Sequence, residues 1–135
     1  MPSPLALPSD VEEFYALCGG VTLFEGGDYS IRIPAPEDFI PSNLAVIGET
    51  GFDDRSDRWF VIGVTDDSEY VSVDLDEARR GQCYDSFHET HGIVGESRIV
   101  AKTFTGFLSA LLADGGSGWY WLRSDFPDLG DAYDD

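Results

Sequence analysis

The sequence predicts an α+β fold in which a central, mainly antiparallel sheet is flanked by an N-terminal and a C-terminal helix. Apolar residues recur at helical spacing near the start of the chain and again after residue 103. Between them lie short runs of β-forming residues separated by tight turns, and such short connections favour antiparallel pairing. The length of 135 residues is that of one domain, so residues 1–135 are expected to form a single domain.

The first helix is expected over residues 9–18. Ser9 and Glu12 have the spacing of a capping box, in which each side chain satisfies a backbone amide at the helix start. One apolar face then follows at helical spacing: Val11, Phe14, Tyr15, Leu17 and Cys18. Gly19 and Gly20 end the helix, because glycine tolerates the left-handed conformation found at helix ends.

The C-terminal helix is expected to begin after Thr103, which fits an N-cap position. Its apolar face is formed by Phe104, Phe107, Leu108, Leu111 and Leu112. The polar and glycine run at residues 114–116 stops this helix, so it spans about three turns.

The β elements lie between the two helices. The expected strands are residues 21–24, 29–33, 44–47, 59–64, 70–75 and 82–87. Residues 98–101 fit either a last strand or a linking turn. The charged stretch at residues 51–58 is expected to be a loop.

The segment from Gly118 to Asp135 alternates large apolar groups with acids. It starts with Trp119, Tyr120 and Trp121, which form a compact aromatic run. One interpretation is a final strand or clamp on the core, followed by a frayed tail. The other is a docking arm, in which aromatic anchors bind a partner and acids steer it.

Charge is the most unusual feature of the composition. The chain has 26 acidic residues against 8 lysines and arginines, a formal net charge of −18. Such a surface repels nucleic acid phosphates and anionic lipid headgroups, so neither a nucleic acid nor a membrane is an expected partner. It attracts basic proteins, although a high net charge also has a simpler explanation in solubility.

Candidate catalytic and metal-binding sets are weak. Cys83, Asp85, His88 and His91 have the residue types of a zinc site, but not a strong zinc-site spacing. Cys83 with either histidine, or a histidine with Ser86 or Ser97, would be needed for nucleophilic catalysis, and no nucleophile-elbow motif is present. We therefore expect no enzyme activity, no metal and no cofactor.

The remaining sequence signals concern compartment and redox state. Two cysteines do not make a disulfide framework, and Cys18 lies on an apolar helix face, so a buried free thiol is expected there. The sequence shows no secretory signal and no apolar run long enough to span a membrane. These observations indicate a cytoplasmic protein.

Several motifs, taken in order, resemble the SUKH superfamily, the group founded on a fungal cell-wall assembly regulator. The run from Leu7 to Tyr15 that closes on Gly19-Gly20 is similar to its opening motif. The remaining matches are Trp59 to Gly63 with Val71 to Leu75, then Gly81, Tyr84 and His88-Glu89, then Lys102 to Leu112. The resemblance covers about residues 7–113 and leaves an aromatic and acidic extension at residues 114–135.

The resemblance implies an α+β domain that works by binding another protein. Bacterial members of the superfamily are mostly immunity proteins that neutralise a toxin, often a nuclease, and need no catalytic residue. The first hypothesis is therefore an immunity protein that binds a basic toxin, and the alternative is a binding or regulatory module for an endogenous cytosolic protein. The expected contact residues are acids in predicted loops and in the tail: Asp53, Asp54, Asp57, Asp66, Asp67, Glu69, Asp128 and Asp131.

Overall fold

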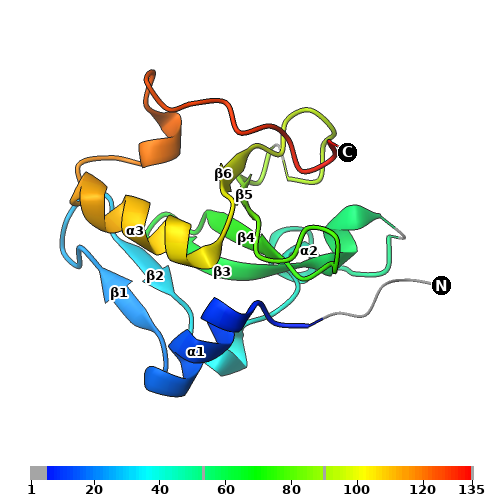
Figure 1. Ribbon diagram of the computed structural model, residues 1–135, viewed down its shortest axis with the longest axis horizontal. Helices are drawn as coiled ribbons and strands as arrows, with labels where there is room; N and C mark the ends of the chain where they lie inside the picture. The colour runs from blue at the N-terminus through cyan, green and yellow to red at the C-terminus, as the bar shows by residue number, and fades with distance from the viewer. Residues whose placement is uncertain (1–5, 53, 90, 135) are drawn as a thin grey trace.

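The computed structural model describes residues 6–52, 54–89 and 91–134. One antiparallel sheet contains six strands in chain order: β1 (Val21–Leu23), β2 (Ile31–Ile33), β3 (Trp59–Thr65), β4 (Tyr70–Asp74), β5 (Cys83–Ser86) and β6 (Ile99–Ala101). The α-helices are α1 (Ser9–Leu17), α2 (Ser42–Val46) and α3 (Phe104–Asp114). Short 3₁₀ turns are η1 (Pro36–Asp38), η2 (Arg55–Arg58) and η3 (Tyr120–Leu122). The predicted α+β fold, with an N-terminal and a C-terminal helix flanking the sheet, is confirmed (Figure 1).

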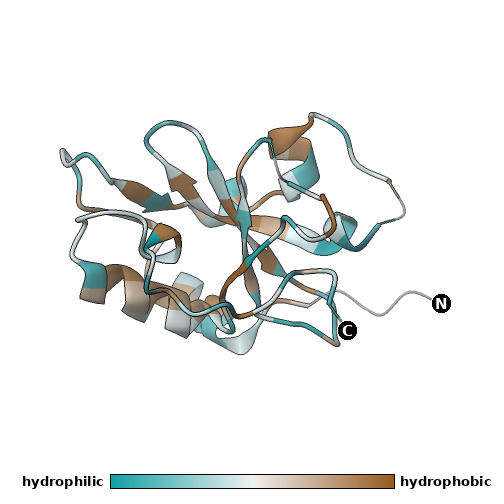
Figure 2. Ribbon diagram, turned by 90° about the horizontal axis from the view of Figure 1, so that it is seen from above, coloured by the Kyte–Doolittle hydropathy of each residue, from teal (hydrophilic) through white to brown (hydrophobic). Residues whose placement is uncertain are grey.

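The central hairpin of β3 and β4 sets the shape of the sheet. The pairing runs from Trp59 opposite Asp74 to Val64 opposite Tyr70, with an irregularity between Val61 and Gly63. A Cβ atom at Gly63 would lie 3.4 Å from the ring of Phe107 in α3, so glycine allows the helix to pack closely. Figure 2 shows apolar segments gathered along the strands, whereas the connecting loops are largely hydrophilic.

Helices α1 and α3 pack on one face of the sheet. Phe104 and Phe107 are fully buried, and the rings of Phe14 and Phe104 meet edge to face at 5.3 Å. Helix α3 starts at the expected cap, because the Thr103 hydroxyl accepts a hydrogen bond from the Gly106 amide at 2.9 Å. It ends at Gly115, which adopts the left-handed conformation.

The start and end of α1 differ from the sequence prediction. Pro8 occupies the N-cap position without a side-chain hydrogen bond, so the predicted capping box of Ser9 and Glu12 is wrong. Asp10 instead accepts hydrogen bonds from the amide and hydroxyl of Thr105, which ties α1 to α3. At the other end, Leu17 is 88% exposed, because the helix stops before its last turn can reach the core.

Residues 44–47 were expected to form a strand, and this expectation is wrong. They belong to helix α2 and its C-cap, which pack against β3 and β4. A run of four apolar residues does not distinguish a strand from a helix by its period. The preceding Ser42 and Asn43 are buried. Ser42 accepts a hydrogen bond from Ser72 in β4, and Asn43 accepts one from His91. These contacts hold this part of the chain as a helical turn. The expected loop at residues 51–58 also contains a structured turn, η2, in its second half.

The C-terminal segment is folded against the sheet, so the expected frayed tail is wrong for the described residues. Tyr120 and Trp121 are buried on the core, as the clamp interpretation predicts. The chain then runs alongside β6, where the Ile99 amide donates to Gly130 and the Ala132 amide donates to Ser97. In Figure 1 this red segment returns toward the loop before β6.

The described ranges contain no helix that is both long and apolar enough to cross a membrane. Cys18 follows the last residue of α1 and is half-buried, whereas Cys83 in β5 is fully buried, and both are free thiols. The burial expected of Cys18 is therefore only partial, since its backbone is extended at the helix end.

Candidate partner-binding groove

A groove of about 610 Å³ lies between the β3–β4 turn, the end of β5, the loop before β6 and the C-terminal segment. One part of its lining is aromatic or apolar: Tyr70, Phe87, Trp119, Trp121 and Leu122. The other part is acidic: Asp67, Glu69, Asp85 and Glu96. One arginine, Arg98, also lines it, so the groove carries four carboxyl groups against a single guanidinium.

The β3–β4 turn positions two of these acids. The Thr65 hydroxyl donates to the carboxylate of Asp67 and accepts a hydrogen bond from the Glu69 amide at 2.9 Å. Ser68 adopts a left-handed backbone conformation with φ of 64°, which tightens the turn. The turn therefore holds both carboxyl groups at the edge of the groove.

Glu69 also joins this turn to the residues that follow β5. Its carboxylate accepts a hydrogen bond from the His88 amide at 3.0 Å, and the His88 ring nitrogen Nδ1 lies 2.5 Å from the same carboxylate. Because a charged acceptor strengthens such bonds, they fix the mouth of the groove on the Phe87 side.

Asp85 lies deeper, on the face of β5 that points into the groove. Its carboxylate accepts a hydrogen bond from the Phe87 amide at 3.1 Å. Burial raises the pKa of Asp85 above its ordinary value, and the nearby Glu69 charge acts in the same direction. The Phe87 amide, Arg98 and Trp121 oppose that rise, because each of them favours the ionised form.

The C-terminal segment forms the aromatic wall. The rings of Trp119 and Trp121 stack with centroids 5.6 Å apart and an interplanar angle of 15°. Arg98 holds this wall, because its guanidinium donates to the Trp121 carbonyl at 3.3 Å and lies 5.7 Å from the ring centroid of Phe126. Tyr29 also meets Trp119 edge to face, with ring centroids 5.3 Å apart.

A second acidic depression adjoins the groove and shares Gly95 and Arg98 with it. Its acids are Asp128, Asp131 and Asp134. Asp131 accepts hydrogen bonds from three backbone amides, those of Gly95 (3.1 Å), Ser97 (2.7 Å) and Tyr133 (3.1 Å). This one carboxylate therefore fastens the C-terminal segment to the loop before β6.

The structure brings together some of the predicted contact residues and separates others. Asp67 and Glu69 line the groove, and Asp128 and Asp131 line the adjoining depression. Asp66 is exposed on the same turn but lines a different depression, beside Arg32. Asp53 lies outside the described residues.

Asp54 and Asp57 belong to the turn η2. They form a capping box in which Asp54 accepts from the Ser56 amide at 3.0 Å and Asp57 accepts from the Asp54 amide. Burial acts to raise the pKa of Asp54, but hydrogen bonds from Tyr133 and Ser56 outweigh it, and the pKa is lowered. Asp54 and Asp57 thus stabilise the turn η2, and neither of them lines the groove.

Sequence reasoning missed three kinds of groove residue. Asp85 shares its strand face with Cys83 and Phe87, so alternation placed it correctly, but the acid itself was considered only as a metal ligand. Glu96 meets the same criterion of an acid in a loop as the predicted residues, so no separate signal marked it. The two tryptophans were considered either as a strand or clamp on the core or as part of a docking arm, and not as the wall of a groove.

The candidate zinc ligands are not brought together. Cys83 faces the core, where its sulfur contacts the carbonyls of Gly81 and Thr103. His88 is exposed beside Glu69, and His91 is buried on the other side of the sheet. Within the described ranges, no cluster of three or more His, Cys, Asp or Glu side chains is placed to hold a metal ion. Burial also raises the pKa of the Cys83 thiol, which disfavours the reactive thiolate.

Ser86 and His91 do lie together, in a buried chain of polar groups. The Ser86 hydroxyl lies 3.0 Å from His91 Nδ1 and 2.5 Å from the Ser72 hydroxyl, which donates to Ser42 at 2.7 Å. Asn43 accepts at its Oδ1 from His91 Nε2, at 2.6 Å. Ser86 has no exposed surface, so its hydroxyl is not accessible to a substrate in this structure.

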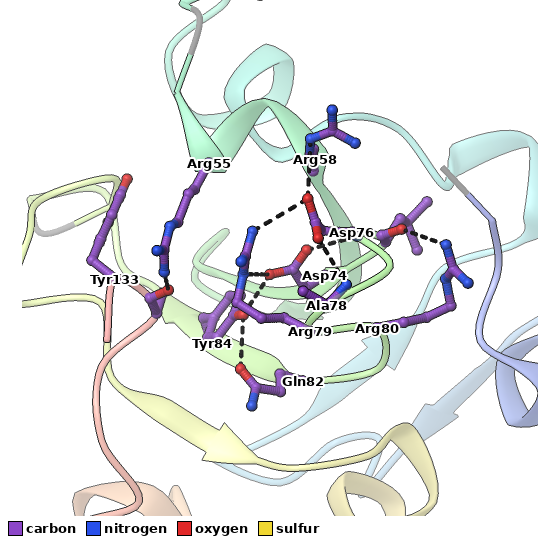
Figure 3. A network of polar contacts seen from close by, with 12 residues as sticks. Arg55, Arg58, Asp74, Asp76, Ala78, Arg79, Arg80, Gln82, Tyr84 and Tyr133 are labelled. Atoms are coloured by element: carbon purple, nitrogen blue, oxygen red, sulfur yellow. Dashed lines mark hydrogen bonds and ion pairs between the residues drawn. The ribbon is translucent and has the colours of Figure 1, made fainter. Parts of the chain in front are cut away.

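A second buried network lies around the link between β4 and β5 (Figure 3). The carboxylate of Asp74 accepts hydrogen bonds from the Asp76 amide (2.9 Å), Arg79 Nε (3.2 Å) and the Tyr84 hydroxyl (2.5 Å). Asp76 in turn pairs with Arg58 at 3.2 Å and with Arg79 at 3.4 Å. Burial raises the pKa of Asp74 despite these donors. Because Asp74 is fully buried, it stabilises the link between the two strands from within the protein.

The comparison with known proteins identifies the family of the chain. Residues 4–110 match the SMI1 / KNR4 family (SUKH-1), and the chain belongs to that family. It is similar to the Immunity protein YokJ of Bacillus subtilis (strain 168), with 45% identity over 128 residues, or 95% of this chain and 78% of that protein. No solved structure gives a significant match. The resemblance to the SUKH superfamily that the motifs indicated is confirmed.

Proposed function

We propose that this chain is a cytoplasmic immunity protein that forms one domain over residues 1–135 and neutralises a cognate toxin by binding it. The similarity to an immunity protein over nearly its whole length supports this role. The toxin is proposed to present a basic, nuclease-like surface, and the observation that carries this point is the groove with four carboxyl groups and one arginine.

Charge complementarity explains how such binding would be fast and specific. A net charge of −18 attracts a basic surface over the distance of a Debye length, which raises the association rate. Nucleases bear basic surfaces because they bind phosphate, and a protein that covers such a surface blocks access of nucleic acid. The acidic groove is a local site at which this attraction would act at close range.

Inhibition by binding requires no catalysis from the immunity protein. The three nucleophile candidates of the sequence are all fully buried: Cys83, Ser86 and Ser97. We therefore propose that the protein is not an enzyme and uses no cofactor.

The test is co-expression with the toxin domain encoded beside its gene. Cells that produce both proteins should survive, and the purified chain should stop nucleic acid cleavage by the purified toxin at a stoichiometry near one to one. Survival with no effect on nuclease activity would contradict the nuclease assignment while keeping the immunity role. Cell death despite production of the folded chain would refute the immunity role itself.

A further inference from the structure

We propose that the groove receives an arginine side chain of the partner, with its guanidinium between the carboxyl groups and the tryptophan wall. This inference rests on the proposed function, because it names the group of the toxin that the groove recognises. It commits to arginine on three observations: the charge balance of the groove, the form of its aromatic wall and the exposed apolar groups at its rim.

The first observation is the charge balance inside the groove. Arg98 lies near Asp85, and His88 is hydrogen-bonded to Glu69. Among the described residues, no cationic side chain lies within ion-pair distance of Asp67 or Glu96. A cation that enters the groove therefore meets two carboxylates whose charge the chain itself does not balance.

The second observation is the aromatic wall, which favours arginine over lysine. Trp119 is half-buried, lines the groove and stacks on Trp121, which is only 4% exposed, so Trp119 supplies the accessible flat ring surface of the wall. A planar guanidinium stacks on such a surface and donates hydrogen bonds in a fork that matches carboxylates, whereas an ammonium is more strongly hydrated. Arg98 shows the same chemistry inside the protein, since it lies over the Phe126 ring and donates to a wall carbonyl.

The third observation is the apolar rim. Leu122 on the wall is 62% exposed, and Val94, which is 71% exposed, directly precedes the groove residue Gly95, with the exposed Ile93 before it. Exposed apolar groups around a charged recess are typical of a protein-docking surface, because they exclude water from the central contact. The occupant is therefore a side chain on a protein surface and not a free cation.

The wall also has a distinct position along the chain. The family match ends at residue 110, whereas Trp119, Trp121 and Leu122 lie beyond it. The groove thus combines acids from the part of the chain that matches the family with an aromatic wall from the extension. This arrangement assigns to residues 119–122 the discrimination between arginine and other side chains of the partner.

The direct test uses a peptide probe and the indole NMR signals of the protein. The probe is acetyl-Gly-Arg-Gly-amide, and the comparison peptides carry lysine or citrulline in place of arginine, the latter being neutral and nearly isosteric. The signals of Trp119 and Trp121 should shift on titration with the arginine peptide, with a dissociation constant on the order of millimolar. The signal of the fully buried Trp59 should stay constant and report an intact fold.

Matched variants separate the groove from general acidity. The double variant Asp67→Asn with Glu96→Gln should weaken binding of the arginine peptide at least tenfold. Asp66→Asn removes one carboxylate charge from the turn that carries Asp67, but outside the groove, and should change binding less than twofold. Trp119→Leu should abolish the preference for arginine over lysine. Equal shifts with the citrulline peptide, or an equal effect of Asp66→Asn and the double variant, would overturn the inference.

The same variants distinguish this inference from the proposed function. If the wild-type chain protects cells and the Asp67→Asn, Glu96→Gln variant binds the toxin as tightly as Asp66→Asn does, the immunity role stands and the arginine site is wrong. If the arginine peptide binds as described and the chain fails to protect, the site stands and the immunity role is wrong. Protection together with at least tenfold weaker toxin binding by the double variant would support both.

Discussion

Protonation of His91 should destabilise the folded protein, because this histidine is buried in its neutral form. Asn43 donates through its side-chain nitrogen to Asp57 and Ser56, both at 3.1 Å, so its oxygen faces His91 and Nε2 must carry the hydrogen. In the neutral ring, Nδ1 then carries no hydrogen, and it lies 3.0 Å from the Ser86 hydroxyl. Burial lowers the pKa of His91 from 6.5 to about 4, and the negative charge of Asp54 opposes that change only in part.

The size of the effect follows from the difference between the folded and unfolded states. Between about pH 4 and 6.5 the unfolded chain binds a proton at this histidine and the folded chain does not, so the free energy of unfolding falls as the pH is lowered. The full difference of about 2.5 in pKa corresponds to roughly 3 kcal/mol at 1.36 kcal/mol per unit. By pH 5 most of it is expressed, about 2 kcal/mol relative to pH 7.5.

The assay is urea unfolding at pH 7.5 and pH 5 for the wild type and for His91→Gln. The wild type should lose about 2 kcal/mol more than the variant between the two pH values, because all other titrating groups are common to both. If His91→Gln loses as much stability on acidification as the wild type, the buried neutral state of His91 is wrong.

Two further predictions concern Asp131, which fastens the C-terminal segment, and Gly20, which directly precedes β1. Asp131→Asn removes a carboxylate that accepts hydrogen bonds from three backbone amides, so the free energy of unfolding should fall by about 1–3 kcal/mol. The Ala132 amide should also exchange faster with deuterium. Asp128→Asn, whose carboxylate accepts one backbone amide, should have a smaller effect. Gly20→Ala should cost about 1–3 kcal/mol in thermal unfolding, because Gly20 has φ of 110° and an added Cβ would lie 2.8 Å from the Ile33 carbonyl oxygen. Gly19→Ala, where an added Cβ meets nothing within 4 Å, should leave stability nearly unchanged, and a loss equal to that of Gly20→Ala would contradict the steric argument.

Local sequence patterns predicted the structure correctly where contacts between residues close together in the chain determine it. The Thr103 cap and the glycine at residue 115 defined α3, and the turn at residues 66–69 defined the central hairpin. The pattern failed at α2, because four apolar residues fit either period and the buried contacts of Ser42 and Asn43 involve residues far along the chain. It failed again at the start of α1, where the contact of Asp10 with Thr105 replaces a local cap.

The composition shows that the chain is acidic, but it does not show to which side of the fold each carboxylate points. Asp66 and Asp67 are adjacent and chemically identical, yet only Asp67 lines the groove, because successive turn residues point to different sides. Asp131 was chosen as an exposed contact residue, and the structure shows that it also holds three backbone amides. The sequence alone does not distinguish an acid that contacts a partner from an acid that stabilises the fold.

The sequence by itself determined the fold class, the family and the large negative charge, since these depend on periodicity, ordered motifs and composition. Only the tertiary structure decided which acids share a surface and what lies opposite them. Asp67 comes from the β3–β4 turn, Asp85 from strand β5 and Glu96 from the loop before β6, and the tryptophan wall comes from beyond the last strand. Antiparallel pairing and the return of the C-terminal segment along β6 bring these residues together, and long-range contacts of that kind leave no local signal in the sequence.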